Sequence, residues 1–230
     1  MFRHIVLTFT VILASFASAQ TASPSTKAAS NDPLMAQLVA LRDNFVDQVK
    51  AEGFKVSLPP PTIVLDNPPS FGNYEDEKNL LHIAAWSALS ADDQARFSRL
   101  ADMLGNGRTG EQAFDDGVHH WVFIHEMGHW WQACTHKADS HYGTEYDANR
   151  IAAAYWRLKD PEFMQRTDKK VTMVLAARPN PVPDGQDKQK YFDANYDTLA
   201  RTPAYIWYQY DMIAHVQAEK PLPSFRQTLQ

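Results

Sequence analysis

The chain has 230 residues, with 22 basic and 27 acidic side chains and a formal net charge of −5. This length suits one large domain or two small ones, and the shares of charged (21%) and hydrophobic (44%) residues are typical of a globular protein. The acidic balance disfavours nucleic acid and anionic membranes as partners. The single cysteine excludes an intramolecular disulfide and a cysteine-based zinc finger.

Residues 1–19 have the pattern of a cleaved export signal. They combine a short basic start at Arg3, an apolar run over 5–16 and a small-x-small cleavage pattern from Ala17 to Ala19. The apolar run is too short for a membrane span, which needs about 20 residues, and no later stretch is long and apolar enough to span. We therefore expect an exported protein, periplasmic or secreted, with no membrane span after signal cleavage.

Beyond the signal, residues 20–32 are rich in Ser, Thr and Ala, which predicts a flexible leader. Residues 33–230 are expected to form a single domain. Apolar side chains at helical spacing predict a helix over 33–52, which Gly53 ends. Short β-prone runs predict a small sheet in the N-terminal half. Its expected strands are 54–58, 62–65 and 79–84.

The rest of the chain has the spacing and the capping residues of helices. Ser90 with Asp93, and Thr144 with Asp147, each show the pattern of a capping box, and a Thr-Pro pair at 202–203 suits a helix start. The predicted helices are 91–104, a long one from Glu111 or Asp115 to about Thr135, 144–159, 161–177 and 203–220. The expected fold is therefore α+β and mainly helical, with a small antiparallel or mixed sheet and a helical C-terminal part.

The long helix carries the segment His125-Glu126-Met127-Gly128-His129. Two histidines four positions apart lie on one face of a helix, so both imidazoles can point at one ion. A glutamate beside the first histidine can take a proton from a water bound to that ion. Zinc suits two imidazoles because it is four-coordinate and borderline soft. The segment predicts zinc ligands at His125 and His129 and a general base at Glu126.

A third ligand distinguishes a metal site from a helix with two structural histidines. His136 lies one residue too late for the long form of the motif, and this chain has Gln132 and Thr135 where that form has glycine and histidine. Asp147 lies one residue too late for a form that places aspartate after a Gly-Thr pair. His141, in the expected loop between the two helices, is a further competitor.

Glu145 fits the third position better. It lies 16 residues after His129, which leaves room to end one helix and start another. It shares a helix face with Ala148, Asn149 and Ala152, and the two alanines allow a close approach to the metal-binding helix. Asn149 can hydrogen-bond a ligand histidine from outside the coordination shell. The alternative is an ordinary acidic residue near a helix N-terminus, which the helix dipole favours.

The order His125-Glu-Met-Gly-His129, then Glu145-Tyr-Asp-Ala-Asn149, resembles the gluzincin class of zinc metallopeptidases, in particular its compact members with a Glu-x-x-Ala-Asp/Asn motif. The resemblance implies a zincin-like fold in which His125, His129 and Glu145 bind Zn²⁺. It also implies that Glu126 polarises the catalytic water and that Asn149 orients a ligand.

The same resemblance implies an antiparallel edge strand above the metal, which aligns an extended peptide substrate. Gly72-Asn-Tyr74, leading to residues 79–83, is the candidate for that strand. The motifs cover about a third of the mature chain, and the remainder, including the last predicted helix, matches no subfamily. The compact cytoplasmic members of the class do not fit an exported chain.

Hydrolysis of an amide normally needs a hydrogen-bond donor to the developing oxyanion besides the metal. The sequence offers several donors and does not choose among them. They are Tyr142, Tyr205, Tyr208, Tyr210 and His215.

These observations predict an exported zinc metallopeptidase that acts on a peptide or protein substrate. One alternative is a non-catalytic exported module that binds zinc and acts through partner contacts, with a site closed by a fourth ligand such as His136 or His141. Another is a metallohydrolase of a non-peptide amide or ester. The cleavage specificity and the oligomeric state do not follow from the sequence.

Overall fold

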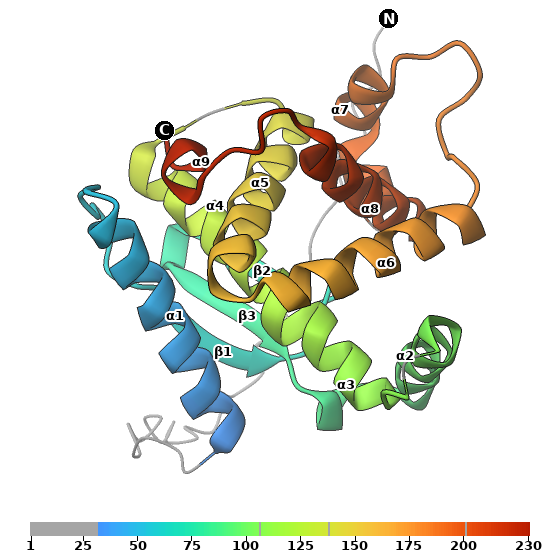
Figure 1. Ribbon diagram of the computed structural model, residues 1–230, viewed down its shortest axis with the longest axis horizontal. Coiled ribbons are helices and arrows are strands. Elements are labelled where there is room, and N and C mark those ends of the chain that lie inside the picture. The colour runs from blue at the N-terminus through green and yellow to red at the C-terminus, as the bar shows by residue number, and fades with distance from the viewer. Residues whose placement is uncertain (1–31, 106, 138, 201) are drawn as a thin grey trace, which may run out of the picture. The chain divides into compact units, whose positions relative to one another are not determined.

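The computed structural model describes residues 32–105, 107–137, 139–200 and 202–230 (Figure 1). The predicted signal at 1–19 lies outside the described residues, as does the expected leader apart from Asp32. The helices are α1 (Pro33–Ala51), α2 (Ala91–Leu104), α3 (Gly110–Phe114), α4 (Phe123–Thr135), α5 (His141–Lys159), α6 (Pro161–Ala177), α7 (Lys188–Leu199), α8 (Pro203–Ala218) and α9 (Phe225–Thr228). The strands are β1 (Thr62–Asp66), β2 (Gly72–Glu75) and β3 (Leu80–Ala84). Three short segments complete the described elements: the 3-10 turns η1 (Asp76–Lys78) and η2 (Trp86–Ala88), and the π-helical segment η3 (Asp115–Val122).

Helix α1 begins and ends where its sequence predicts. The Asp32 side chain accepts a hydrogen bond from the backbone N–H of Leu34 at 3.0 Å, and Pro33 occupies the first helical position. Gly53, with a φ of 87°, follows the helix and takes a backbone conformation that glycine adopts freely. The helix buries Leu38, Phe45, Val46 and Val49.

The three strands form a mixed sheet in the order β1-β3-β2, with β1 parallel and β2 antiparallel to the central strand. This confirms the expected small mixed sheet and makes β2 an edge strand. The N–H of Ala84 donates to the C=O of Phe71 at 2.9 Å, so Asn73, two residues on, also turns its backbone groups toward β3. Gly72 and Tyr74 therefore direct their N–H and C=O groups outward, to the free side of the edge.

The expected strand over 54–58 is wrong, because these residues form no strand or helix. Phe54 and Val56 pack against the core as partly buried side chains, and Ser57 donates its hydroxyl to the C=O of Cys134. The segment leads into three consecutive prolines, 59–61, which have no N–H to give to a ladder. Its apolar side chains are thus buried without a partner strand.

The long predicted helix is present, but it contains a π-helical stretch. α3, η3 and α4 follow one another without a break from Gly110 to Thr135. A capping box between Thr109 and Gln112 opens the helix, and His136 ends it in the left-handed conformation, with a φ of 51°. π segments are rare and frequently lie at functional sites. This one directly precedes the turn of α4 that carries the two predicted ligand histidines.

Helix α5 begins earlier than predicted, and the predicted capping box between Thr144 and Asp147 is wrong. Ser140 caps the helix by accepting a backbone N–H of the first turn at 3.1 Å. The N–H of Thr144 donates to the C=O of Ser140 at 2.9 Å, so Thr144 already lies inside the helix. Asp147 forms ion pairs with Lys137 and Arg150 instead.

The C-terminal part is helical as predicted, and it contains two more helices. α6 matches the predicted range of 161–177, and α8 ends two residues before its predicted end. Thr202 does not cap α8, because its hydroxyl donates to the C=O of Leu199. The sequence does not predict α7, because this helix is largely polar and Phe192 and Leu199 are its only buried residues. α9 is a single turn, too short to show a period.

Helix α4 lies between the sheet and α5 (Figure 1). It packs on β2 and β3 with one side and on α5 with the other, while α8 covers α5 and α6. A Cβ on Gly128 of α4 would lie 3.1 Å from Cα of Ala148 on α5. This contact confirms the close helix approach that the small residues of α5 predict. Among the described residues, no helix combines the length and the apolar character needed to cross a membrane.

Candidate metal centre

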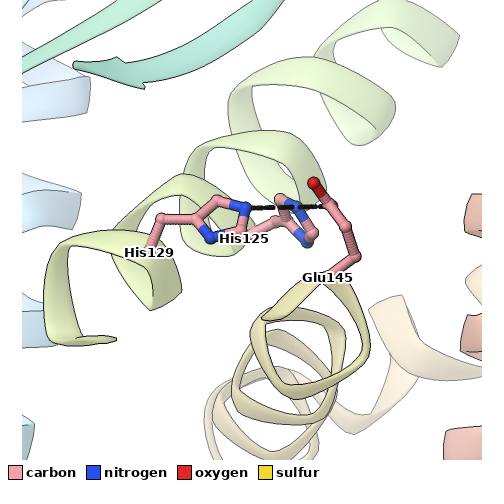
Figure 2. Close-up of side chains that lie close together, drawn as sticks. All are labelled: His125, His129 and Glu145. Atoms are coloured by element: carbon pink, nitrogen blue, oxygen red, sulfur yellow. Dashed lines mark hydrogen bonds and ion pairs between the residues drawn. The ribbon is translucent and has the colours of Figure 1, made fainter. Parts of the chain in front are cut away.

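Three of the predicted site residues meet between α4 and α5. Nε2 of His125 lies 3.1 Å from Oε2 of Glu145 and 3.1 Å from Nε2 of His129 (Figure 2). Nε2 of His129 lies 3.8 Å from the same carboxylate oxygen. Their potential ligand atoms all lie within 4.8 Å of one another. His125 and Glu145 are only 6% and 4% exposed, so the cluster is largely shielded from water.

The three side chains are strongly coupled electrostatically. Burial alone would lower the pKa of His129, but the hydrogen bond and the charge of Glu145 outweigh burial and raise that pKa to about 9. Burial alone would raise the pKa of Glu145, but hydrogen bonds from His125 and His129 hold it well below its usual range. The carboxylate is therefore ionised at neutral pH, as a metal ligand must be.

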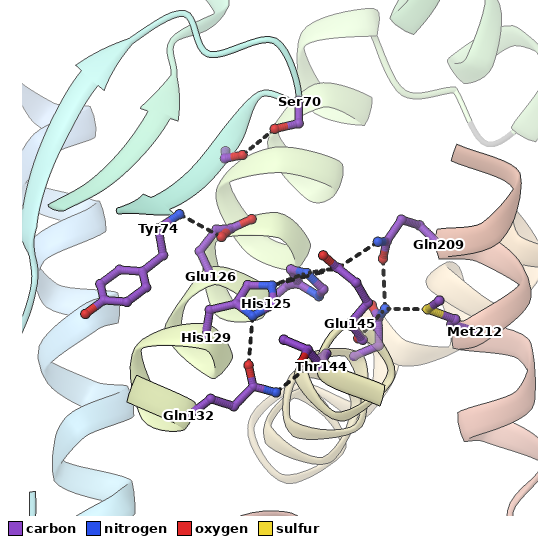
Figure 3. Close-up of polar contacts among 12 residues, drawn as sticks. Ser70, Tyr74, His125, Glu126, His129, Gln132, Thr144, Glu145, Gln209 and Met212 are labelled. Carbon is purple, nitrogen blue, oxygen red and sulfur yellow. Dashed lines mark hydrogen bonds and ion pairs between the residues drawn. The ribbon is translucent and has the colours of Figure 1, made fainter. Parts of the chain in front are cut away.

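Gln132 determines which nitrogen of His129 is free to bind a metal. Its amide N–H donates to the C=O of Thr144 at 2.8 Å, which directs its oxygen toward Nδ1 of His129, also at 2.8 Å (Figure 3). An oxygen acceptor at Nδ1 requires the proton of the neutral imidazole to lie there. In the neutral ring the lone pair is then on Nε2, the nitrogen that points into the cluster. Because the pKa of His129 is raised to about 9, a metal ion must displace a proton from Nε2 when it binds at neutral pH.

Glu145 is held by groups from the C-terminal helices. The hydroxyl of Tyr196 on α7 donates to Oε1 at 3.1 Å, and the amide of Gln209 on α8 donates to Oε2 at 2.8 Å. Figure 3 shows the Gln209 amide reaching the carboxylate from the side of α8. These bonds fix the orientation of the carboxylate between two elements far apart in the sequence.

Asn149 does not have the contact predicted for it. We expected a hydrogen bond to a ligand histidine. Instead its amide donates to the C=O of Glu145 at 3.0 Å and to the side-chain oxygen of Gln209 at 2.8 Å. Its own oxygen accepts from the indole N–H of Trp121 at 3.3 Å. Asn149 thus orients Gln209, and through it Glu145, while no described residue hydrogen-bonds the buried Nδ1 of His125.

Glu126 lies beside the cluster and turns its carboxylate to the edge strand. Its Oε2 accepts the backbone N–H of Tyr74 at 2.9 Å, and the residue is only 8% exposed. The C=O of Gly72, the other outward-facing residue of β2, accepts the hydroxyl of Ser70 at 2.6 Å (Figure 3). A Cβ on Gly72 would lie 2.3 Å from Val122 and 3.5 Å from Glu126, so glycine lets the strand lie close to the helix.

The donor set suits a metal ion. Two imidazole nitrogens and one carboxylate oxygen converge, and two histidines with one glutamate form a known ligand set of catalytic zinc sites. In the part of the chain that the structure describes, the metal-capable group consists of His125, His129 and Glu145. A buried group of this kind can bind a metal ion.

The competing ligands predicted from the sequence are not part of that group. His136 ends α4 in a left-handed conformation, and Asp147 pairs with Lys137. The ring of His141 stacks on that of Tyr196, with centroids 4.1 Å apart and an interplanar angle of 1°. Among the described residues, the group therefore offers three candidate ligands and no fourth histidine, cysteine or acidic residue.

Of the five predicted oxyanion donors, Tyr205 is the one whose pKa is affected by the charge of Glu145. Burial and the charge of Glu145 raise the pKa of Tyr205 well above its usual range, so its hydroxyl stays protonated. The other four have contacts elsewhere. Tyr142 packs on Phe192, and the hydroxyl of Tyr208 donates to the C=O of Lys188. Tyr210 packs against the hydrophobic core that includes the buried side chains of α4, and Nδ1 of His215 lies next to the C=O of Asp211.

Three residues that hold the cluster were missed at the sequence level. In the sequence, Gln132 stands out only as a departure from the long form of the motif. Tyr196 and Gln209 lie on α7 and α8, and no spacing rule links them to a histidine motif more than 60 residues away.

No protein-family model matches the sequence, and neither a curated protein nor a solved structure matches it.

Proposed function

We propose that the chain is a zinc metallopeptidase of the gluzincin class with a zincin-like fold. The observation that carries the proposal is the convergence of His125, His129 and Glu145 at the junction of α4 and α5, with Glu126 beside them. Two imidazoles and a carboxylate are the donors that zinc takes in catalytic sites. A site with three protein ligands leaves a coordination position for water or substrate.

The three ligands would bind through Nε2 of His125, Nε2 of His129 and Oε2 of Glu145. A zinc ion held by them supplies Lewis acidity, which lowers the pKa of a coordinated water to about 7 and polarises a carbonyl group. Gln132 keeps the proton of His129 on Nδ1, and Gln209 orients the carboxylate. These contacts hold the side chains of His129 and Glu145 in position before any metal binds.

Glu126 is the proposed general base. Its Oε2 is engaged by the N–H of Tyr74, so Oε1 is the oxygen left to hold the transferred proton. The same carboxylic acid would then give that proton to the leaving amine. The burial of Glu126 excludes bulk water from this transfer.

The edge of β2 is the proposed binding surface for an extended peptide. Gly72 and Tyr74 present backbone groups on the free side of the strand, next to the carboxylate of Glu126. An extended substrate can add to such an edge by main-chain hydrogen bonds. The C=O of Gly72 keeps a second lone pair for this purpose beyond the one that Ser70 engages.

Tyr205 is the proposed donor to the oxyanion. Its hydroxyl stays protonated at neutral pH, and a positioned donor in a buried site stabilises charge that develops on a carbonyl oxygen. We also propose that the protein acts after export, because residues 1–19 match a cleavable signal.

The test is a cleavage profile of a peptide library with the zinc-loaded mature chain, with Glu126→Gln as control. The variant keeps the shape of the site and loses the base, so cleavage should fall by at least about 100-fold. Equal cleavage by both proteins would refute the role of Glu126. Ester or non-peptide amide turnover without any peptide cleavage would refute the peptidase proposal.

A further inference from the structure

A cavity lies away from the metal centre, beside α6. Its volume is about 460 Å³, within the usual range of small-molecule sites. The lining comes from the end of α2, the start of the long helix and the first three turns of α6. None of His125, His129 and Glu145 lines it.

The lining is cationic, although the whole chain carries a net charge of −5. Its positively charged side chains are Arg108, Arg166, Lys169 and Lys170, against the two acids Asp116 and Glu162. The two carboxylate oxygens of Asp116 are shared, because Oδ1 lies 3.0 Å from Arg108 and Oδ2 lies 3.7 Å from Nε of Arg166. The cavity thus holds more positive than negative charge.

Lys170 carries the strongest indication of a ligand. The residue as a whole is only 7% exposed, and within the described chain its ammonium group has no hydrogen bond or ion pair. Nζ is not among the fully buried polar atoms, so the ammonium group remains accessible from the cavity that it lines. Its Nζ lies 3.8 Å from the position that a Cβ on Gly117 would take, so it sits against the π segment. A cation in the wall of a cavity, with no ion pair of its own, is free to form a charge-assisted hydrogen bond with an anion.

Two further polar groups of the lining lack a hydrogen-bond partner in the described structure. The hydroxyl of Thr167, a residue only 2% exposed, is buried without one. Nε of Arg166 is also buried without a hydrogen bond. Both lie on α6, three and four residues before Lys170, and therefore within one helical turn of it. An ammonium, a guanidinium and a hydroxyl form a donor set for oxygen atoms of an anion.

We propose that this cavity binds a small molecule that bears an oxyanion, either a phosphate or a carboxylate. The guanidinium and ammonium groups supply charge-assisted hydrogen bonds, and Thr167 supplies a neutral one. Leu104, Ala113 and Phe163 line the same cavity and suit the carbon part of an organic ligand. The site is independent of the proposed peptidase centre.

The test measures binding of inorganic phosphate and of succinate to the zinc-loaded mature chain by calorimetry and by the shift in Tm. The main variant is Lys170→Met, which keeps the length of the side chain and removes its charge. Thr167→Val removes the hydroxyl and keeps the shape. Lys55→Met, at an exposed lysine outside the cavity, controls for the change in net charge.

The proposal predicts saturable binding of at least one of the two anions to the wild type. Binding should weaken by about ten-fold or more in Lys170→Met and by about three-fold or more in Thr167→Val, and remain unchanged in Lys55→Met. In anion-free buffer the Tm of Lys170→Met should stay close to that of the wild type, because the ammonium group has no ion pair or hydrogen bond in the described structure to lose. Phosphate alone would identify a tetrahedral oxyanion, and succinate alone a carboxylate.

Absence of saturable binding of both anions would overturn the proposal. So would equal affinity in the wild type and Lys170→Met, since an anion bound at the metal centre would not sense that substitution. Should Lys170→Met fail to fold, Thr167→Val decides, and unchanged affinity in that variant would count against the cavity.

Discussion

The side-chain oxygen of Gln132 lies 2.8 Å from Nδ1 of His129, three residues earlier on the same helix. The amide of Gln132 is anchored on the other side by the C=O of Thr144. A contact at this place fixes the tautomer of His129 and the direction of its free lone pair. The residue that departs from the long form of the histidine motif is thus the one that prepares the second histidine as a ligand.

Replacement of Gln132 should weaken zinc binding without removing it. Gln132→Leu keeps the size of the side chain but leaves Nδ1 of His129 and the C=O of Thr144 without their partner. Loss of such an outer contact typically lowers metal affinity by about 10- to 100-fold. Competition with a chromophoric chelator measures the change, and Gln165→Leu on the exposed face of α6 is the control. Wild-type affinity in Gln132→Leu would mean that the amide contact has no part in metal binding.

A methyl group on Gly128 should disturb the junction of α4 and α5. The added Cβ would lie 3.1 Å from Cα and 3.3 Å from the C=O oxygen of Ala148, and backbone atoms cannot move aside locally. We expect Gly128→Ala to lower the free energy of unfolding by about 1–3 kcal/mol. It should also weaken zinc binding, because a displacement of α5 away from α4 moves Glu145 away from the two histidines.

Gly117→Ala is the matched control on the same long helix. Its added Cβ would meet its nearest atoms, on Lys170 and Phe97, at 3.8 Å, an ordinary contact. Its stability should stay within about 1 kcal/mol of the wild type. Chemical denaturation of both variants checks the comparison, and equal stability of the two would contradict a tight helix junction at Gly128.

Removal of the Tyr205 hydroxyl should slow turnover and leave the zinc content unchanged. Loss of an oxyanion donor typically costs about 10²- to 10³-fold in kcat, so Tyr205→Phe should show a lower kcat with a nearly unchanged KM. Tyr208→Phe is the control, because that hydroxyl donates to the C=O of Lys188 away from the cluster. A wild-type kcat in Tyr205→Phe would assign the donor to another group.

Asp115 should give the stability of the protein a dependence on acid pH. Burial alone would raise the pKa of Asp115, but the hydrogen bond from His119 and the charge of His120 lower it below its usual 3.8. A lowered pKa stabilises the folded protein fully above pH 3.8, and this stabilisation is lost as the pH falls through the lower folded-state pKa. His119 also contacts the C=O of Ala84, so this pair ties β3 to the π segment.

Asp115→Asn tests this coupling by urea denaturation at several pH values. At pH 7 the variant should be less stable by about 0.5 kcal/mol, a small value because solvent reaches the carboxylate and screens it. The difference should shrink below pH 3.8, where the unfolded carboxyl is protonated. A difference that stays constant from pH 7 down to acid would exclude the proposed cause.

The sequence was sufficient for features that depend on local chemistry. The cap of α1 at Asp32 and the stop at Gly53 follow from side chains next to the helix ends. The juxtaposition of His125 and His129 follows from helix geometry alone. The small residues Ala148 and Ala152 on one face of α5 correctly predict close packing against α4.

Features that depend on tertiary packing were not accessible in this way. Ser140 rather than Thr144 caps α5, and two serine or threonine residues four positions apart offer equal local signals. Asn149 was matched to a histidine by spacing, but Gln209 on α8 competes for its amide. The contact of Tyr196 with Glu145 depends on α7, a polar helix whose weak periodicity left it unpredicted.

The metal content of the purified mature chain tests the central claim most directly. The wild type and Glu126→Gln should each retain about one zinc per chain after dialysis against metal-free buffer, because Glu126 is not one of the proposed ligands. His129→Ala should retain none, and only the wild type should cleave peptide. A folded wild type that fails to bind zinc, or a His129→Ala protein that binds it as well as the wild type, would contradict the account.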